Sequence, residues 1–136
     1  MMKQLLTLVT LCLFSFASLA QSSNVVDEAN AWLTTVDAGK YEESWEQAGG
    51  YFQSAISQAE WVDALNSARS PLGESLSRVV TESIEHDSLP GVPDGDYTIV
   101  VFESQFEHLE AAKETITLVN EASDCHVVGY FIAPGH

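Results

Sequence analysis

Both arginines of this chain are candidate binding residues, because carboxylates greatly outnumber cations around them. The sequence has 20 acidic residues against five lysines and arginines. Arg78 falls on the face of a predicted strand that carries large apolar residues, and a buried unpaired charge is very costly. One hypothesis is that its planar guanidinium binds the carboxylate or phosphate of a ligand. The other is a structural ion pair, either with Glu82 or Glu74 or, more readily, with a carboxylate of a neighbouring strand such as Glu103 or Glu114.

Three further polar side chains extend this candidate site. Arg69 precedes a Pro-Leu-Gly turn, where it either braces the chain against helix-end carbonyls or a carboxylate, or lies at a pocket mouth. His126 and Tyr130 share one face of the last predicted strand by alternation, and they converge with Arg78 if that face is inward. A histidine there could act as a general acid or base near neutral pH. A hydrogen-bonded core histidine is the simpler interpretation.

The three tryptophans fall one on each predicted helix. Trp32, Trp45 and Trp61 could line an aromatic ligand cage, but each lies on the apolar stripe of its helix, which favours ordinary core packing. We retain Trp45 as a candidate ligand contact beside the two arginines, His126 and Tyr130.

Motifs for catalysis, metals and cofactors are missing from the sequence pattern. There is no phosphate-binding glycine loop and no serine elbow. No two histidines have the spacing of a zinc-binding helix. Asp94 and Asp96 flank a glycine, but turn formation explains them better than a calcium loop does. We therefore predict no catalytic set, no metal site and no cofactor.

Helical periodicity marks the first half of the chain. Apolar residues at helical spacing predict three helices, over 24–38, 41–48 and 57–70. Ser23 or Asn24 is expected to cap the first. Ser57 and Glu60 form a capping box for the third, which Pro71 ends because proline disfavours helical geometry in the preceding residue.

From Glu74 onward the period of the apolar pattern changes from helical spacing to alternation. Four strands are predicted, over 74–86, 97–102, 113–119 and 127–132. The inner face of the first is expected to carry Leu76, Arg78, Val80, Glu82, Ile84 and His86. Short connections favour an antiparallel meander, and helices followed by strands favour an α+β domain.

Residues 1–20 have the pattern of a secretory signal peptide. Lys3 precedes an apolar run, and Ser18 and Ala20 place small residues where a signal peptidase cleaves. The run is shorter than the roughly 20 residues that span a bilayer, which disfavours a retained membrane anchor. Residues 21–136 are then expected to form one domain that is exported to the periplasm or secreted.

The formal net charge of −15 limits the classes of partner. Strong negative charge repels phosphate backbones, so nucleic acid is not an expected partner. Cys125 is the one cysteine outside residues 1–20, and it is either buried or available for pairing between chains. Its place at the edge of an apolar strand favours burial.

The order of several motifs resembles a family of small exported bacterial proteins with a domain of unknown function, of the DUF 4019 type. The matching pieces are Ala31-Trp32-Leu33, 37–41, Ser44-Trp45, Trp61, 69–73, Arg78, 89–97 and 128–132. His126 is a departure, because the family often has tryptophan at that place. Helices followed by a sheet are also similar to the broader NTF2-like, or cystatin-like, cone. This resemblance implies three N-terminal helices packed on a curved four-stranded antiparallel meander that encloses a pocket.

The cone hosts enzymes, ligand binders and docking modules, so the fold does not choose among them. We expect a non-catalytic domain that binds a small anionic or amphipathic ligand, or docks a protein, through the pocket. One alternative is a ketosteroid-isomerase-like enzyme with a pocket carboxylate or His126 as base. The other is a structural homodimer built on the exposed sheet face.

Overall fold

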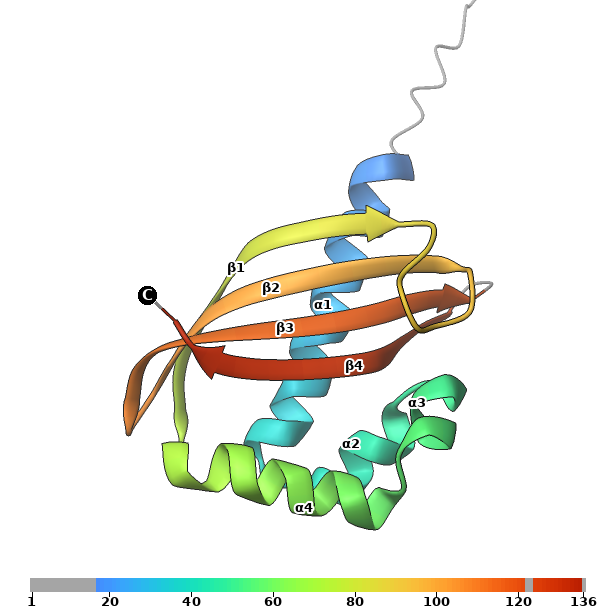
Figure 1. The fold of residues 1–136 in the computed structure, drawn as a ribbon. Coiled ribbons are helices and arrows are strands. Elements are labelled where there is room, and N and C mark those ends of the chain that lie inside the picture. The colour runs from blue at the N-terminus through green and yellow to red at the C-terminus, as the bar shows by residue number, and fades with distance from the viewer. Residues whose placement is uncertain (1–16, 122–123, 136) are drawn as a thin grey trace, which may run out of the picture.

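A computed structural model describes residues 17–121 and 124–135, with side chains described from Val25 onward. Within these ranges, four α-helices and a short 3₁₀ helix precede four strands, which is an α+β arrangement (Figure 1). The elements are α1 Ala17–Asp37, α2 Tyr41–Gln47, α3 Gly50–Ala55, α4 Gln58–Arg69, η1 Ser70–Leu72, β1 Ser75–His86, β2 Asp96–Phe106, β3 Leu109–Glu121 and β4 Asp124–Pro134.

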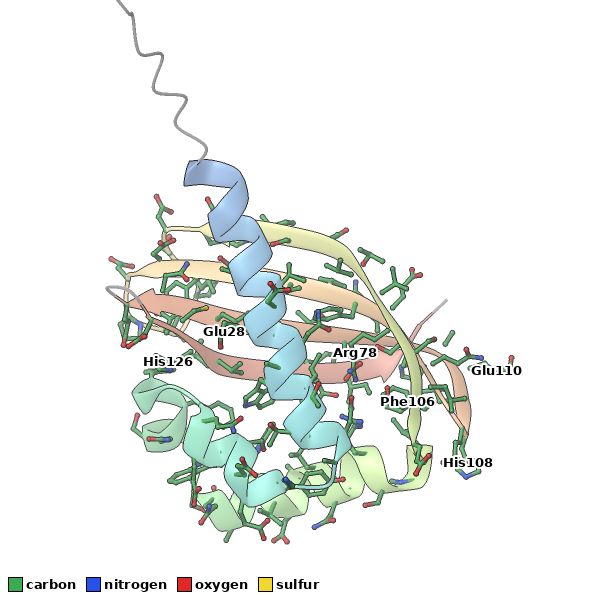
Figure 2. All side chains as sticks on the ribbon, turned by 180° about the vertical axis from the view of Figure 1, so that it is seen from behind. Glu28, Arg78, Phe106, His108, Glu110 and His126 are labelled. Atoms are coloured by element: carbon green, nitrogen blue, oxygen red, sulfur yellow. The ribbon has the colours of Figure 1, made fainter. Side chains whose placement is uncertain are left out.

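The strands form one open antiparallel sheet in the order β1-β2-β3-β4. Figure 2 shows α1 crossing one face of this sheet, which we call the inner face. Helices α2, α3 and α4 lie beside the β4 edge (Figure 1). Within the described ranges no helix lies over the opposite, outer face, so the apolar core forms between the inner face, α1 and the helices beside the β4 edge.

The helices differ from the prediction in number and in one boundary. Helix α1 begins at Ala17, so Ser23 and Asn24 lie inside it and do not cap its start. Helix α3 is a fourth helix, which places Phe52 in the core against Trp61. In the part of the chain that the structure describes, no helix combines the length and the apolar character needed to cross a bilayer.

The Ser57 half of the predicted capping box is present at the start of α4. Ser57 has extended backbone geometry, and its Oγ accepts the Glu60 N–H at 3.2 Å. The helix ends at Arg69, and Pro71 lies in the first turn of η1. This confirms the signals that were predicted to start and stop the third helix.

A register shift in β1 changes which side chains face the core. Val80 pairs with Phe102 and Glu82 pairs with Val101, so Thr81 is an extra residue in the ladder. An extra residue reverses the alternation beyond it. Arg78 lies on the inner face as predicted. Glu82, Ile84 and His86 lie on the outer face, and their predicted inward orientation is wrong.

Two tryptophans pack in the core, and their indole N–H groups have partners there. Trp32 Nε1 donates to the Ser44 carbonyl and Trp61 Nε1 to the Ser44 hydroxyl, each at 2.9 Å. Trp45 packs at the margin of the core and donates to the Ile56 carbonyl at 2.9 Å. Satisfied indoles on apolar helix stripes fit core packing, as their positions predicted.

The joint between the helices and the sheet, which runs from η1 to the start of β1, depends on Gly73. Its backbone has φ 76° and ψ −157°, a region open essentially to glycine alone. A Cβ atom there would lie 2.9 Å from the Cβ of Glu107, in the β2–β3 hairpin. The hairpin is bonded to the joint, since the Glu107 carboxylate accepts the Glu74 N–H at 2.7 Å and the His108 N–H donates to the Leu72 carbonyl at 2.9 Å.

We therefore predict that Gly73→Ala lowers the free energy of unfolding by about 1–3 kcal/mol, the usual cost of a strained backbone residue. Urea unfolding followed by tryptophan fluorescence measures this change. The matched control is Gly50→Ala at the start of α3, because a Cβ atom at Gly50 would point into open space. Equal stability of the two variants would contradict the role of Gly73.

Candidate functional site

Six polar side chains from six different elements meet on the inner face, and we call them the charge cluster. Each strand contributes one residue: Arg78 from β1, Ser104 from β2, Glu114 from β3 and Tyr130 from β4. Asp37 and Arg69 are the last residues of α1 and α4. The charge cluster thus joins two helix ends to all four strands.

Arg78 is bound by two carboxylates of its own chain. Its Nε donates to Glu114 Oε1 at 2.8 Å. Its Nη1 and Nη2 donate to the two oxygens of Asp37 at 2.7 and 3.0 Å, a bidentate pair. Only 10% of the side chain is exposed. The predicted ion pair with Glu114 is confirmed, although β2 separates β3 from β1, so Glu114 does not lie on a neighbouring strand.

Arg69 is more deeply buried, with 4% of its side chain exposed. Its Nη2 donates to Asp37 Oδ1 at 2.6 Å, and its Nη1 lies 3.4 Å from the Tyr130 hydroxyl and 3.9 Å from Glu114 Oε2. The guanidinium also lies over the Phe106 ring, 4.8 Å from its centroid, as a cation–π contact. This geometry fits the bracing role predicted for Arg69, and its burial excludes a place at a pocket mouth.

Glu114 is the centre of the charge cluster and has no exposed surface. It accepts hydrogen bonds from Arg78, from the Ser104 hydroxyl and from the Tyr130 hydroxyl. Burial, and then the Glu114 charge, raise the pKa of Tyr130 well above its ordinary value. The phenol therefore stays protonated and donates to the carboxylate.

The charges of the cluster balance each other, two guanidinium groups against two carboxylates. Burial alone would lower the pKa of Arg78, but its hydrogen bonds to Asp37 and Glu114 outweigh burial and raise it. An anionic ligand at Arg78 would have to displace one of these carboxylates. The geometry therefore favours the structural role of Arg78 over the capture of an anion.

His126 lies apart from the charge cluster. Val127 pairs with Leu118 and Gly129 pairs with Thr117, so Val128 is an extra residue in β4. Val127 and Tyr130 both pack on the core, and His126 therefore does not share a face with Tyr130. The predicted convergence of His126 with Tyr130 and Arg78 is wrong, because alternation cannot reveal an extra residue. Figure 2 shows Arg78 toward one end of the strands and His126 toward the other.

His126 instead borders a hollow of about 630 Å³ between α1 and β4. The apolar part of its lining is made by Ala31, Trp32, Leu118 and Val127. Three exposed carboxylates stand around it, from Asp27, Glu28 and Asp124. Thr35, Gln47, Cys125 and His126 complete the lining. The hollow thus has an apolar floor and an acidic rim.

Cys125 is a free thiol in the wall of this hollow. Burial, and then the charges of Glu28 and Asp96, raise the pKa of this thiol to about 11. It is therefore protonated at neutral pH and is a poor nucleophile. The hollow also lacks a metal centre, since no group of His, Cys, Asp and Glu within the described ranges is arranged to hold a metal ion.

Asp37 was not predicted as a site residue, although its position in the sequence carries a signal. An acidic residue in the last turn of a helix opposes the helix dipole, so it is expected to have a cationic partner elsewhere. The rim carboxylates carried no comparable signal, because acidic residues on helix surfaces and in turns are common in this chain.

We predict that Glu114→Gln lowers the free energy of unfolding by about 3–5 kcal/mol, because it leaves buried guanidinium charge uncompensated. Urea unfolding provides the measurement. Glu82→Gln is the control: Glu82 is exposed on the outer side of β1, and surface changes stay within about 0.5 kcal/mol. If Glu114→Gln does not fold, adding Arg78→Met should restore folding by removing one unmatched charge. An equal loss of unfolding free energy in Glu114→Gln and Glu82→Gln would contradict the role of Glu114.

The second prediction for the charge cluster concerns how its stabilising effect changes at acid pH. Burial alone would raise the pKa of Asp37, but hydrogen bonds from Arg78 and Arg69 outweigh it and lower the pKa from 3.8. A lowered pKa means that ionised Asp37 stabilises the fold fully above pH 3.8 and progressively less as the pH falls through the folded-state pKa.

The stability difference between the wild type and Asp37→Asn should therefore be full near neutral pH and shrink below pH 3.8. Chemical unfolding over an acid series measures it. Asp63→Asn, at an exposed position of α4, should show a small difference throughout. A wild-type advantage over Asp37→Asn that persists unchanged in strong acid would show that ionised Asp37 is not the stabilising form.

Comparison with known proteins identifies the family but no activity. No curated protein matches the chain. The family described as "Protein of unknown function (DUF4019)" matches residues 28–130, a span that includes all six residues of the charge cluster and most of the lining of the hollow. The chain therefore belongs to the DUF4019 family.

Proposed function

We propose that this protein is an exported, non-catalytic module that binds a small amphipathic ligand in the hollow between α1 and β4. The observation that carries the proposal is the chemistry of the hollow, an apolar floor of Trp32, Leu118 and Val127 below a rim of carboxylates. Its volume of about 630 Å³ falls in the range of small-molecule sites. The signal-peptide pattern of residues 1–20 supports export to the periplasm of a bacterium, or secretion.

The charge of the hollow favours a cationic head group on that ligand. Asp27, Glu28 and Asp124 surround the opening, and the charge of Glu28 acts on the Cys125 thiol inside it. Complementary charge steers and orients ligands, whereas like charge repels them. An anionic ligand, which the sequence suggested through Arg78, is disfavoured here, because both arginines are occupied by internal carboxylates.

We also assign the domain to the NTF2-like, or cystatin-like, cone. The support is the arrangement of α1 across the inner face of a four-stranded antiparallel sheet, with a hollow at one end of their contact. In such a cone the hollow between helix and sheet is the expected ligand site. The assignment therefore agrees with the position of the proposed site.

The isomerase-like alternative has weaker support than binding. A carboxylate that abstracts a proton from carbon is normally held in an apolar, water-poor site. Asp27, Glu28 and Asp124 are exposed at the rim of the hollow. The buried carboxylate, Glu114, is committed to Arg78, Ser104 and Tyr130. These positions favour recognition of a ligand over proton transfer.

The proposal predicts that n-octylamine binds to the hollow more tightly than n-octanoate or n-octanol, which share its apolar tail. Native mass spectrometry of protein recovered from the periplasm would count the bound molecules. The mass of the protein in the same spectrum would show whether the chain is cleaved after Ala20. Titration followed by tryptophan fluorescence would give the affinities, because Trp32 lines the floor. Tighter binding of n-octanoate would overturn the proposed head group.

Neutralising the rim with Asp27→Asn, Glu28→Gln and Asp124→Asn should weaken n-octylamine binding by roughly tenfold, or about 1.4 kcal/mol. The matched control removes the same charge elsewhere, with Glu60→Gln, Asp63→Asn and Glu110→Gln at exposed positions outside the hollow. Equal weakening in both triple variants would indicate general attraction to an acidic protein instead of a site.

A further inference from the structure

The edge of the sheet at β1 has the features of a strand-docking surface. In the order β1-β2-β3-β4, β1 is an end strand, and β2 pairs with only one of its sides. An end strand presents unpaired backbone N–H and C=O groups that can template another strand. Ser75–His86 is long for such an exposed edge.

The side chains of β1 are unusually apolar for an exposed strand. The described part of the chain leaves six large apolar side chains exposed, and four of them lie on β1. These are Leu76 (58%), Val79 (62%), Val80 (41%) and Ile84 (47%). Val79 and Ile84 lie on the outer face, and Val80 lies on the inner face. A long edge strand with exposed apolar side chains is a ready template for pairing with another strand.

The opposite edge of the sheet is partly covered, which leaves β1 as the open edge. At β4 the Gly49 N–H, at the start of α3, donates to the Val127 carbonyl at 2.8 Å. The loop after β1 folds away from the β1 edge, since the Tyr51 hydroxyl in α3 donates to the Gly91 carbonyl at 2.9 Å. Figure 1 shows the later part of β1 at the margin of the sheet, on the side away from α3.

The part of β1 beyond Thr81 is the regular docking segment. Glu82 to His86 pair with Val101 to Tyr97 without a register shift, so the free side of this segment can pair regularly as well. Glu82 and Ile84 lie on the outer face and Glu85 on the inner face. The segment therefore presents one apolar side chain and two acidic ones, together with Ser83 on the inner face and His86 on the outer face. The cation of the strand, Arg78, is held inward by Asp37 and Glu114.

We propose that Glu82–His86 binds an extended, basic segment of a partner protein, which adds a fifth strand to the sheet. Backbone hydrogen bonds supply the pairing, and side chains opposite the segment supply the selectivity. In antiparallel pairing, the partner places a basic residue opposite Glu85, an apolar residue opposite Ile84 and a basic residue opposite Glu82. Opposite charges across a strand pair are favourable.

A second copy of this chain fits the edge less well. Each copy carries a formal charge of −15, and self-pairing would bring acidic segments together. Like charges opposite each other in neighbouring strands are destabilising. The register shifts at Leu76 and Thr81 also interrupt the long regular edge that a symmetric strand pair would use.

The test uses a blocked peptide of sequence Thr-Lys-Val-Thr-Lys and ¹⁵N-labelled protein observed by NMR. We expect chemical-shift changes centred on Glu82–His86 and absent from the hollow. Replacing Glu82 and Glu85 by Lys should weaken binding of this peptide by roughly tenfold. The same variant should gain binding of the charge-reversed peptide Thr-Glu-Val-Thr-Glu. A variant with Glu60→Lys and Glu110→Lys is the matched control, and it should bind the basic peptide like the wild type.

Backbone methylation separates strand pairing from attraction by charge alone. Two versions of the basic peptide are compared. One carries N-methyl groups on the odd-numbered residues, and the other carries them on the even-numbered residues. Because alternate N–H groups of a strand point to the same side, one version should bind like the parent peptide and the other should lose binding. Equal binding of both versions, or shifts outside β1, would overturn the proposal. If sedimentation shows that the free protein dimerises, and its NMR signals at β1 shift with protein concentration, the edge would be assigned to a second copy.

Discussion

The structure depends on the pairing of two buried arginines with Asp37 and Glu114. An unmatched buried charge costs far more free energy than a single apolar contact contributes. The ends of α1 and α4 must therefore pack against the sheet at the place where the four strands bring their cluster residues together. A well-packed apolar replacement can match a buried ion pair in stability. We infer that the main effect of the charge cluster is to select one arrangement of helices and sheet over similarly compact alternatives.

The charge cluster and the hollow that we propose as a ligand site occupy different parts of the inner face. The cluster occupies one end of the strands, with Arg69 over Phe106, and the hollow occupies the other, bordered by His126. Trp32 connects them, since its ring packs against Tyr130 at 5.5 Å between centroids and also lines the hollow. A fixed cluster at one side of Trp32 therefore preorganises the floor at the other, which lowers the cost of ordering a site on binding.

Local signals in the sequence predicted much of the fold and part of the charge cluster. Alternation places Glu114 on the same face as Ile116 and Leu118, and a carboxylate on an apolar face indicates a buried ion pair. The positions of His126 and of Glu82 could not be predicted in this way. Thr81 is the extra residue between Arg78 and Glu82, and Val128 is the extra residue between His126 and Tyr130. An extra residue is defined by pairing with the neighbouring strand, which has no local signature in these two segments.

Internal pairing of both arginines also determines the character of the surface. Among the described residues, Lys40 and Lys113 are the lysines and arginines that remain outside the charge cluster. The sequence has 20 acidic residues, and all of them except Asp37 and Glu114 lie outside the cluster. The hollow and the β1 edge therefore share an excess of negative charge around an apolar centre. Salt screens the attraction between such exposed charges and a cation, whereas an apolar contact is not screened. The ligand proposed for the hollow and the partner proposed for β1 are therefore both cationic and partly apolar. Their binding would combine a salt-dependent attraction of charge with an apolar contact that salt does not screen.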